Sequence, residues 1–81
     1  MLGMEVEEWR HKSCIAHFGI GKNFATLYDI KSKQEGQGHA TELLKAAKNY
    51  YEAQNFEFGG SVALNDRMRK LYKKLGIKEY A

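Results

Sequence analysis

The glycine-rich segment from Gln34 to Leu44 holds the residues whose types and spacing are most informative about chemistry. Gly36 and Gly38 stand where an apolar stretch ends and an amphipathic stretch begins. In a turn without side chains, the backbone N–H groups and the positive end of the following helix face one point. That arrangement can bind a phosphate or a pyrophosphate without a basic side chain. The alternative interpretation is that these glycines serve the turn alone.

Two familiar phosphate-binding turns do not fit this spacing. A P-loop requires Lys and then Ser or Thr directly after its last glycine, whereas His39 and Ala40 follow Gly38. The dinucleotide-binding fingerprint requires a third glycine at the position that Thr41 occupies. The pattern that does fit is Gly38-x-Ala40 followed directly by a predicted helix.

A second motif lies near the C-terminus. Asn65 ends an apolar stretch, Tyr72 lies further along a predicted helix, and Lys74 and Gly76 precede Ile77. Asn is also a good helix N-cap, so the type of residue 65 alone allows a structural role. Tyr72 can likewise be a packed side chain with its hydroxyl at the surface.

Taken together, the two motifs resemble the GNAT family of N-acetyltransferases over about residues 24–80. The glycine turn resembles the acetyl-CoA pyrophosphate loop of that family, and the second motif resembles its closing segment. Glu35 stands where the family usually has Arg or Gln, and Ile77 replaces the usual Phe. By comparison, the first strand and the two following helices are missing, so the chain resembles a truncated acyl-CoA N-acyltransferase fold.

The resemblance implies a binding site for acetyl-CoA. Two parallel strands are implied to splay apart and to hold the pantetheine arm, with backbone groups at Tyr28 and Ile30 pairing with it and Asn65 touching it. The pyrophosphate is implied to lie on the turn made by Glu35, Gly36, Gln37, Gly38, His39, Ala40 and Thr41.

The implied activity is transfer of an acetyl group to an amine, and the open acceptor side favours a protein amine. The amine attacks the thioester, a backbone N–H near Ile30 meets the oxyanion, and Tyr72 protonates the departing sulfur. No spacing singles out a general base among Glu7, His17 and Asp29. The alternative is a domain of the same kind that binds acetyl-CoA or another protein without catalysis.

Length and composition bound the other possibilities. A chain of 81 residues suits one domain, spanning residues 1–81. One cysteine cannot form an internal disulfide, and neither a membrane-length apolar run nor a signal peptide is visible, so a reducing cytoplasm is the expected location. The net charge of +3 is modest, which disfavours nucleic-acid binding through residues 67–78. Self-association into a homodimer stays open.

A metal site made by His11, Cys14 and His17 is rejected, because a spacing of three along a strand places neighbours on opposite faces. Cys14 is interpreted as core packing.

The hydrophobic pattern predicts an α/β domain with a mixed sheet and two main helices. Strands are expected over residues 4–10, 13–19, 24–30, 56–64 and 77–80. Apolar residues at helical spacing predict one helix over 39–54, and a second helix is expected between Asp66 and Gly76. The first helix makes a parallel crossover between strands 24–30 and 56–64, while the earlier strands connect by hairpins.

Overall fold

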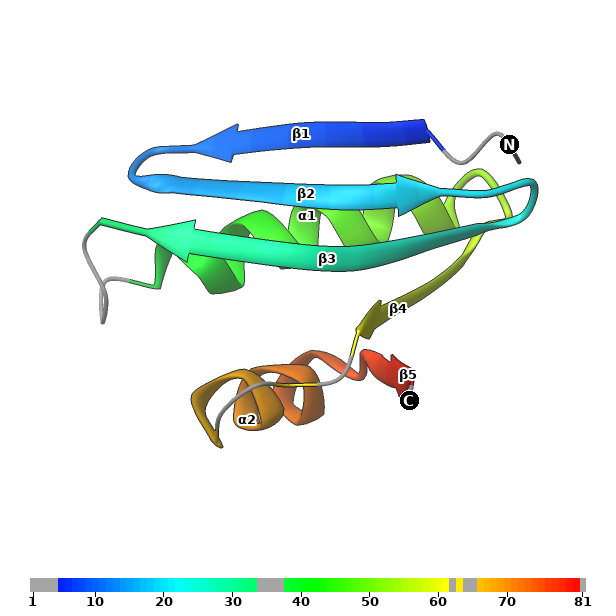
Figure 1. The fold of residues 1–81 in the computed structure, drawn as a ribbon. Helices are drawn as coiled ribbons and strands as arrows, with labels where there is room; N and C mark the ends of the chain where they lie inside the picture. Colours follow the sequence, from blue (N-terminus) through cyan, green and yellow to red (C-terminus); the bar gives the residue numbers. More distant parts are fainter. Residues whose placement is uncertain (1–4, 34–37, 62, 64–65, 81) are drawn as a thin grey trace.

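The structure is a computed structural model that describes residues 5–33, 38–61, 63 and 66–80. Over these residues the chain forms one small domain of five strands and two helices (Figure 1). The predicted α/β domain with a mixed sheet and two main helices is confirmed. The elements are β1 (Glu5–His11), β2 (Cys14–Ile20), β3 (Phe24–Ser32), α1 (His39–Glu52), β4 (Glu57–Ser61), α2 (Asp66–Leu75) and β5 (Lys78–Tyr80).

The sheet has the strand order β1-β2-β3-β4-β5. The first three strands are antiparallel and form hairpins, whereas β3 pairs with β4, and β4 with β5, in parallel. Each parallel pair is connected through a helix, as a parallel connection requires. Strand β4 ends at Ser61, earlier than predicted, and residues 62 and 64 of the predicted strand lie outside the described residues.

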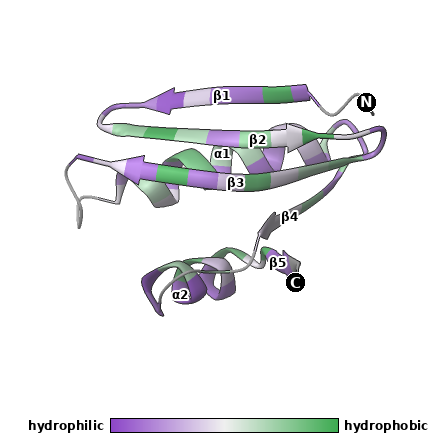
Figure 2. Ribbon diagram, viewed as in Figure 1, coloured by the Kyte–Doolittle hydropathy of each residue, from purple (hydrophilic) through white to green (hydrophobic). Residues whose placement is uncertain are grey.

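The core lies between α1 and one face of the sheet. Alternate residues of β2, Cys14, Ala16 and Phe18, point to that face and are fully buried. Helix α1 lies along the sheet (Figure 1), and Figure 2 shows that hydrophobic and hydrophilic residues alternate along it. Its buried residues recur at helical spacing and are Leu43, Leu44, Ala47 and Tyr51. These two periodicities, of two residues in the strand and 3.6 in the helix, explain why the sequence pattern predicted both elements. No helix in the described ranges is long and apolar enough to span a membrane.

The parallel strands β3 and β4 pair only over a short stretch. Their register runs from Phe24 opposite Glu57 to Leu27 opposite Gly60, yet β3 continues to Ser32. Figure 1 shows β4 bending away from β3 toward α2. The two strands therefore diverge beyond Leu27, and the last residues of β3 lie outside the β3–β4 ladder.

Strand β3 also carries an irregularity at this point. His17 of β2 pairs with Asp29, but the next residue, Phe18, pairs with Leu27. Tyr28 is therefore the extra residue of a β-bulge, which bends a strand and increases its twist. The bulge lies next to the residue after which β3 and β4 part.

Candidate functional site

The start of α1 has the geometry that the glycine turn predicted. Gly38 is the N-cap, with φ of 77° and ψ of 5°, in the left-handed region that favours glycine. A Cβ atom there would meet nothing within 4 Å, and no side chain of the described residues caps this helix end. The first N–H groups of α1 have no partner within the helix itself. They form the positive end of a 14-residue helix whose N-cap residue, Gly38, is exposed.

The side chains of the first turn of α1 anchor the helix to the sheet. The Nδ1 atom of His39 lies 2.9 Å from Oγ of Ser13, which lies 3.3 Å from Oγ of Ser32. The carboxylate of Glu42 bonds to His11 at 2.8 Å and to Lys12 at 3.4 Å. These two partners lower the pKa of Glu42, the His11 hydrogen bond most. The Nδ1 atom of His39 is therefore engaged with Ser13, and this contact positions the first turn of α1 against the sheet.

A groove of about 550 Å³ lies between the two helices. Lys48 Nζ is paired with Glu52 at 3.0 Å. Lys45 and Lys74 form no ion pair with any other described residue. Six residues line this α1–α2 groove: Thr41, Lys45, Lys48, Asn49, Lys74 and Leu75.

Only Thr41 of these lining residues was predicted as a site residue. The sequence analysis assigned no role to Lys45 or Lys48 and did not predict that a second helix borders them. The signal was available in the spacing of Thr41, Lys45 and Lys48, which puts them on one face of α1.

Tyr72 is a buried side chain of α2 that touches β4. Its hydroxyl donates a hydrogen bond of 3.0 Å to the backbone carbonyl of Ser61, the last residue of β4. Burial raises the pKa of Tyr72 above its ordinary value of 10.0, the Ser61 hydrogen bond opposes that shift, and the charge of Glu79 adds to it. The phenol is therefore protonated at neutral pH, as a proton donor must be.

Of the other predicted binding residues, the structure describes Tyr28, Ile30 and Ala40. Tyr28 and Ile30 lie on the part of β3 beyond its last pair with β4; Tyr28 is exposed at the bulge, and Ile30 is half-buried opposite Ala16. Ala40 is half-buried against the core. The remaining predicted residues, Glu35, Gly36, Gln37 and Asn65, lie outside the described residues.

The candidate bases lie on two faces of the sheet. Glu7 accepts a hydrogen bond from Tyr51 on the face that α1 covers. On the opposite face, His17 Nδ1 lies 2.7 Å from Oδ1 of Asp29, and Nε2 lies 3.0 Å from Oε1 of Glu8. Hydrogen bonds to Asp29 and then to Glu8 raise the pKa of His17. Both ring nitrogens therefore lie next to carboxylates, an arrangement that favours the protonated form of the imidazole.

The spacing argument against the metal triad holds for Cys14 and His17 but not for His11, which pairs with Cys14 across the β1–β2 hairpin and bonds to Glu42 of α1 on the same face. Cys14 is buried under α1, and His17 lies on the other face. Within the described ranges, no group of three or more His, Cys, Asp or Glu side chains could hold a metal ion.

Comparisons with known proteins give a fold but no family. No protein-family model matches the chain, and no curated protein matches it. Among solved structures, the crystal structure of the anti-CRISPR protein AcrVA5 matches with a TM-score of 0.76. The match covers 90% of this chain and 83% of that chain, at 11% sequence identity. At this identity the likeness shows a shared fold alone.

The assignment to the GNAT family is therefore wrong as a statement of membership. No family model matches the chain, and the similar structure is reported as an anti-CRISPR protein. The two motifs have local explanations that need no family: Gly38 meets the backbone demand of a helix start, and Tyr72 packs against β4. Short motifs of this kind recur wherever a strand turns into a helix.

Proposed function

We propose that this chain binds acetyl-CoA and transfers its acetyl group to an amine. The observation that carries the proposal is the divergence of β3 from β4 after Leu27 and Gly60. The two diverging strands lead to an anion-binding helix start and to a proton donor, the two groups that acetyl transfer from coenzyme A requires. Beyond the end of β3, α1 starts at Gly38 with uncapped N–H groups, and at the end of β4 the hydroxyl of Tyr72 meets Ser61.

The residues present suit the parts of coenzyme A. The pantetheine arm is an extended chain with amide groups, and such a chain can add to the edge of a strand as a peptide does. The backbone of residues 28–32 offers that edge, because β3 has left its ladder with β4 there. The start of α1 suits the pyrophosphate, since helix N-termini bind anions through their N–H groups and dipole.

Tyr72 is proposed as the proton donor. In acetyl transfer, the bond from nitrogen to the acetyl carbon forms as the carbon–sulfur bond breaks, the nitrogen loses a proton and the sulfur gains one. Tyr72 holds its proton at neutral pH, because burial raises its pKa. Donation to sulfur requires the hydroxyl to turn away from the Ser61 carbonyl. The chain's own residues supply no assigned base, so the amine is proposed to arrive neutral and, once it has attacked the acetyl carbon, to lose a proton to water.

The second candidate is a binding domain without catalysis. It is favoured by the engagement of both His17 nitrogens with carboxylates, which makes this imidazole a poor acceptor for a proton from the amine. The sheet face opposite α1 also exposes large apolar side chains, Val6 at 62% and Tyr28 at 49%. A cytoplasmic location stays a prediction, supported by the free buried thiol of Cys14.

Two measurements test the proposal on the intact chain. Calorimetric titration with acetyl-CoA measures binding, and release of free thiol in the presence of lysine peptides and small amines measures transfer. Binding together with thiol release is the expected result. Binding without release across the amine panel favours the second candidate, and absence of binding overturns the proposal.

A further inference from the structure

We propose that the α1–α2 groove binds the 3′-phosphate of coenzyme A, so that this chain discriminates coenzyme A from its 3′-dephospho form. The inference rests on the proposed function and deepens it by assigning a second anion site. The groove is formed by side chains of two different helices, and so is distinct from the backbone N–H groups at Gly38.

The first argument is charge. Lys45 of α1 and Lys74 of α2 line one groove, and neither has a carboxylate partner in the part of the chain that the structure describes. Ammonium groups on two side chains that line the same groove repel each other, and an anion bound between them removes that repulsion. A phosphate monoester is close to dianionic at neutral pH and accepts several charge-assisted hydrogen bonds. Its charge therefore matches that of the two lysines.

The second argument is position along α1. Thr41 lies in the first turn after Gly38, and Lys45 lies one turn further on the same face. Lys45 lies seven positions after Gly38, which corresponds to about 10 Å of helix axis, and side chains on a helix lean back toward its N-terminus. The groove thus begins beside the anion site at Gly38. One ligand with two phosphate-bearing parts can reach both.

The third argument is the remaining lining. Asn49 and Thr41 offer side-chain hydrogen-bonding groups, and Leu75 offers apolar surface. A volume of about 550 Å³ lies in the range of small-molecule sites and is small for a folded partner. Polar donors, an apolar wall and two cations together suit a phosphorylated nucleoside.

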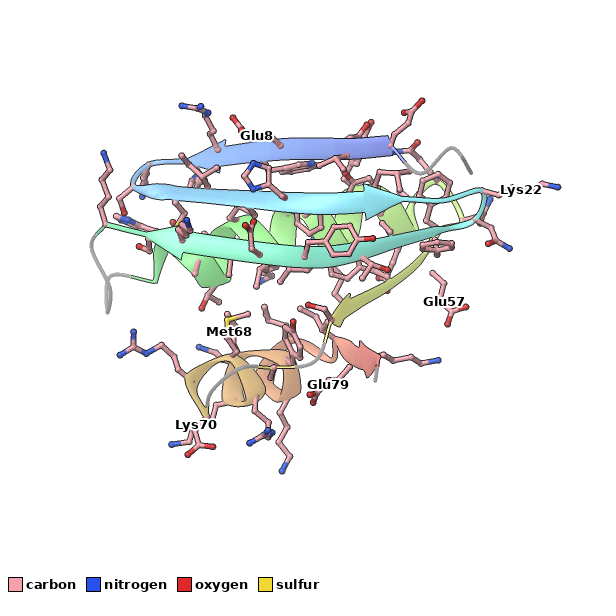
Figure 3. The ribbon with its side chains drawn as sticks, in the orientation of Figure 1. Glu8, Lys22, Glu57, Met68, Lys70 and Glu79 are labelled. Atoms are coloured by element: carbon pink, nitrogen blue, oxygen red, sulfur yellow. The ribbon has the colours of Figure 1, made fainter. Side chains whose placement is uncertain are left out.

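The test compares two ligands and two pairs of substitutions. Calorimetry measures the affinities of coenzyme A and 3′-dephospho-coenzyme A for the parent, for Lys45→Ala with Lys74→Ala, and for Lys22→Ala with Lys70→Ala. The second pair removes the same charge elsewhere: Figure 3 shows Lys22 at the β2–β3 hairpin and Lys70 on the outer side of α2. All four lysines are exposed, and circular dichroism checks that each variant is folded.

The parent is expected to bind coenzyme A at least about tenfold more tightly than the dephospho form, as for loss of a charge-assisted pair of contacts. In the double variant at Lys45 and Lys74, the two affinities should become equal, and the affinity for the dephospho form should stay nearly unchanged. The control double variant should keep the roughly tenfold preference for coenzyme A. Equal affinity of the parent for both ligands overturns the groove assignment and leaves the proposed function intact. The assignment is also overturned if both double variants lose the same preference for coenzyme A, because the change in net charge alone would then explain the effect. If neither ligand binds, the proposed function fails together with the groove.

Discussion

The ring of Tyr72 packs on the backbone of Gly60 so closely that a Cβ atom at residue 60 would lie 2.5 Å from both Cζ and Oη of Tyr72. This contact holds α2 against β4 and aims the phenol at the carbonyl of Ser61. Glycines inside a strand, such as Gly59 and Gly60, are typical of either a β-bulge or a close backbone approach. The structure shows a close approach at Gly60, and β4 pairs with β3 and with β5 without a register shift over the described residues.

Gly60→Ala is therefore expected to destabilise the fold. The added methyl overlaps the ring, and overpacking of a close-packed site costs about 1–3 kcal/mol. Urea unfolding measures the loss. In a Tyr72→Ala background the ring is absent, and the same substitution should cost much less, so that the two changes are not additive. Additive losses would mean that another contact, and not Tyr72, sets the space at residue 60.

Tyr72→Phe tests the proton donor with the packing retained. The ring still fills its place against Gly60, but the hydroxyl bond to Ser61 is lost, which costs about 1 kcal/mol of unfolding free energy. Thiol release should fall by roughly a hundredfold or more, the usual worth of a general acid. The affinity for acetyl-CoA should change little, because the backbone groups that bind it remain.

The pH dependence gives a second readout of the same variant. Burial raises the pKa of Tyr72 above 10.0, so loss of activity through its deprotonation is expected only at pH values above that. Tyr72→Phe should remove that limb of the profile. Tyr50→Phe, at a tyrosine that is 52% exposed, is the matched control and should leave rate and profile unchanged. Full thiol release by Tyr72→Phe would assign the proton to solvent.

The elements of the fold were predictable because their signals are local. The alternation of Cys14, Ala16 and Phe18 and the helical spacing of Leu43 and Leu44 each report one buried face, and the structure buries those faces. The left-handed Gly38 likewise follows from a single position in the chain.

The missed features depend on contacts between distant segments. The α1–α2 groove joins Lys45 to Lys74, and no local pattern states that these helices are neighbours. The array around His17 requires the register of three strands and a bulge at Tyr28, which brings Asp29 opposite His17. From the sequence, His17 and Asp29 were separate candidates for a general base, whereas in the structure their side chains form a hydrogen bond.

Gly38→Ala and Gly76→Ala form a matched pair that separates binding from folding. Both glycines have positive φ, 77° and 69°, and a Cβ atom at either would meet nothing within 4 Å. Each substitution should therefore cost a similar backbone strain of about 1–2 kcal/mol. Only Gly38 precedes the N–H groups of α1, so only its variant should lose acetyl-CoA affinity. Equal affinities in the two variants, measured by calorimetry, would make the glycine turn a structural feature alone.

The array of Glu8, His17 and Asp29 predicts a pH-dependent contribution to stability. The folded pKa of His17 is raised above 6.5, so the folded state holds this proton more tightly than the unfolded state does. The contribution of His17 is thus fully present below pH 6.5 and is lost as pH rises through its folded pKa. The pKa of Glu8 is lowered from 4.5, most by Arg10 and then by His17, so its contribution is lost as pH falls through that lower value. The array therefore stabilises the fold most between pH 4.5 and 6.5.

Nuclear magnetic resonance titration of the His17 ring tests this directly. The measured pKa should exceed 6.5, and Asp29→Asn should lower it more than Glu8→Gln, because the Asp29 hydrogen bond is the largest cause of the shift. High salt should reduce the shift, since all three side chains are solvent-accessible and exposed charges are screened. In urea unfolding, the parent should lose more stability between about pH 5.5 and about pH 8 than His17→Gln does. A His17 pKa at or below 6.5, or one that does not change in the Asp29→Asn variant, would show that the three side chains do not form this array in solution.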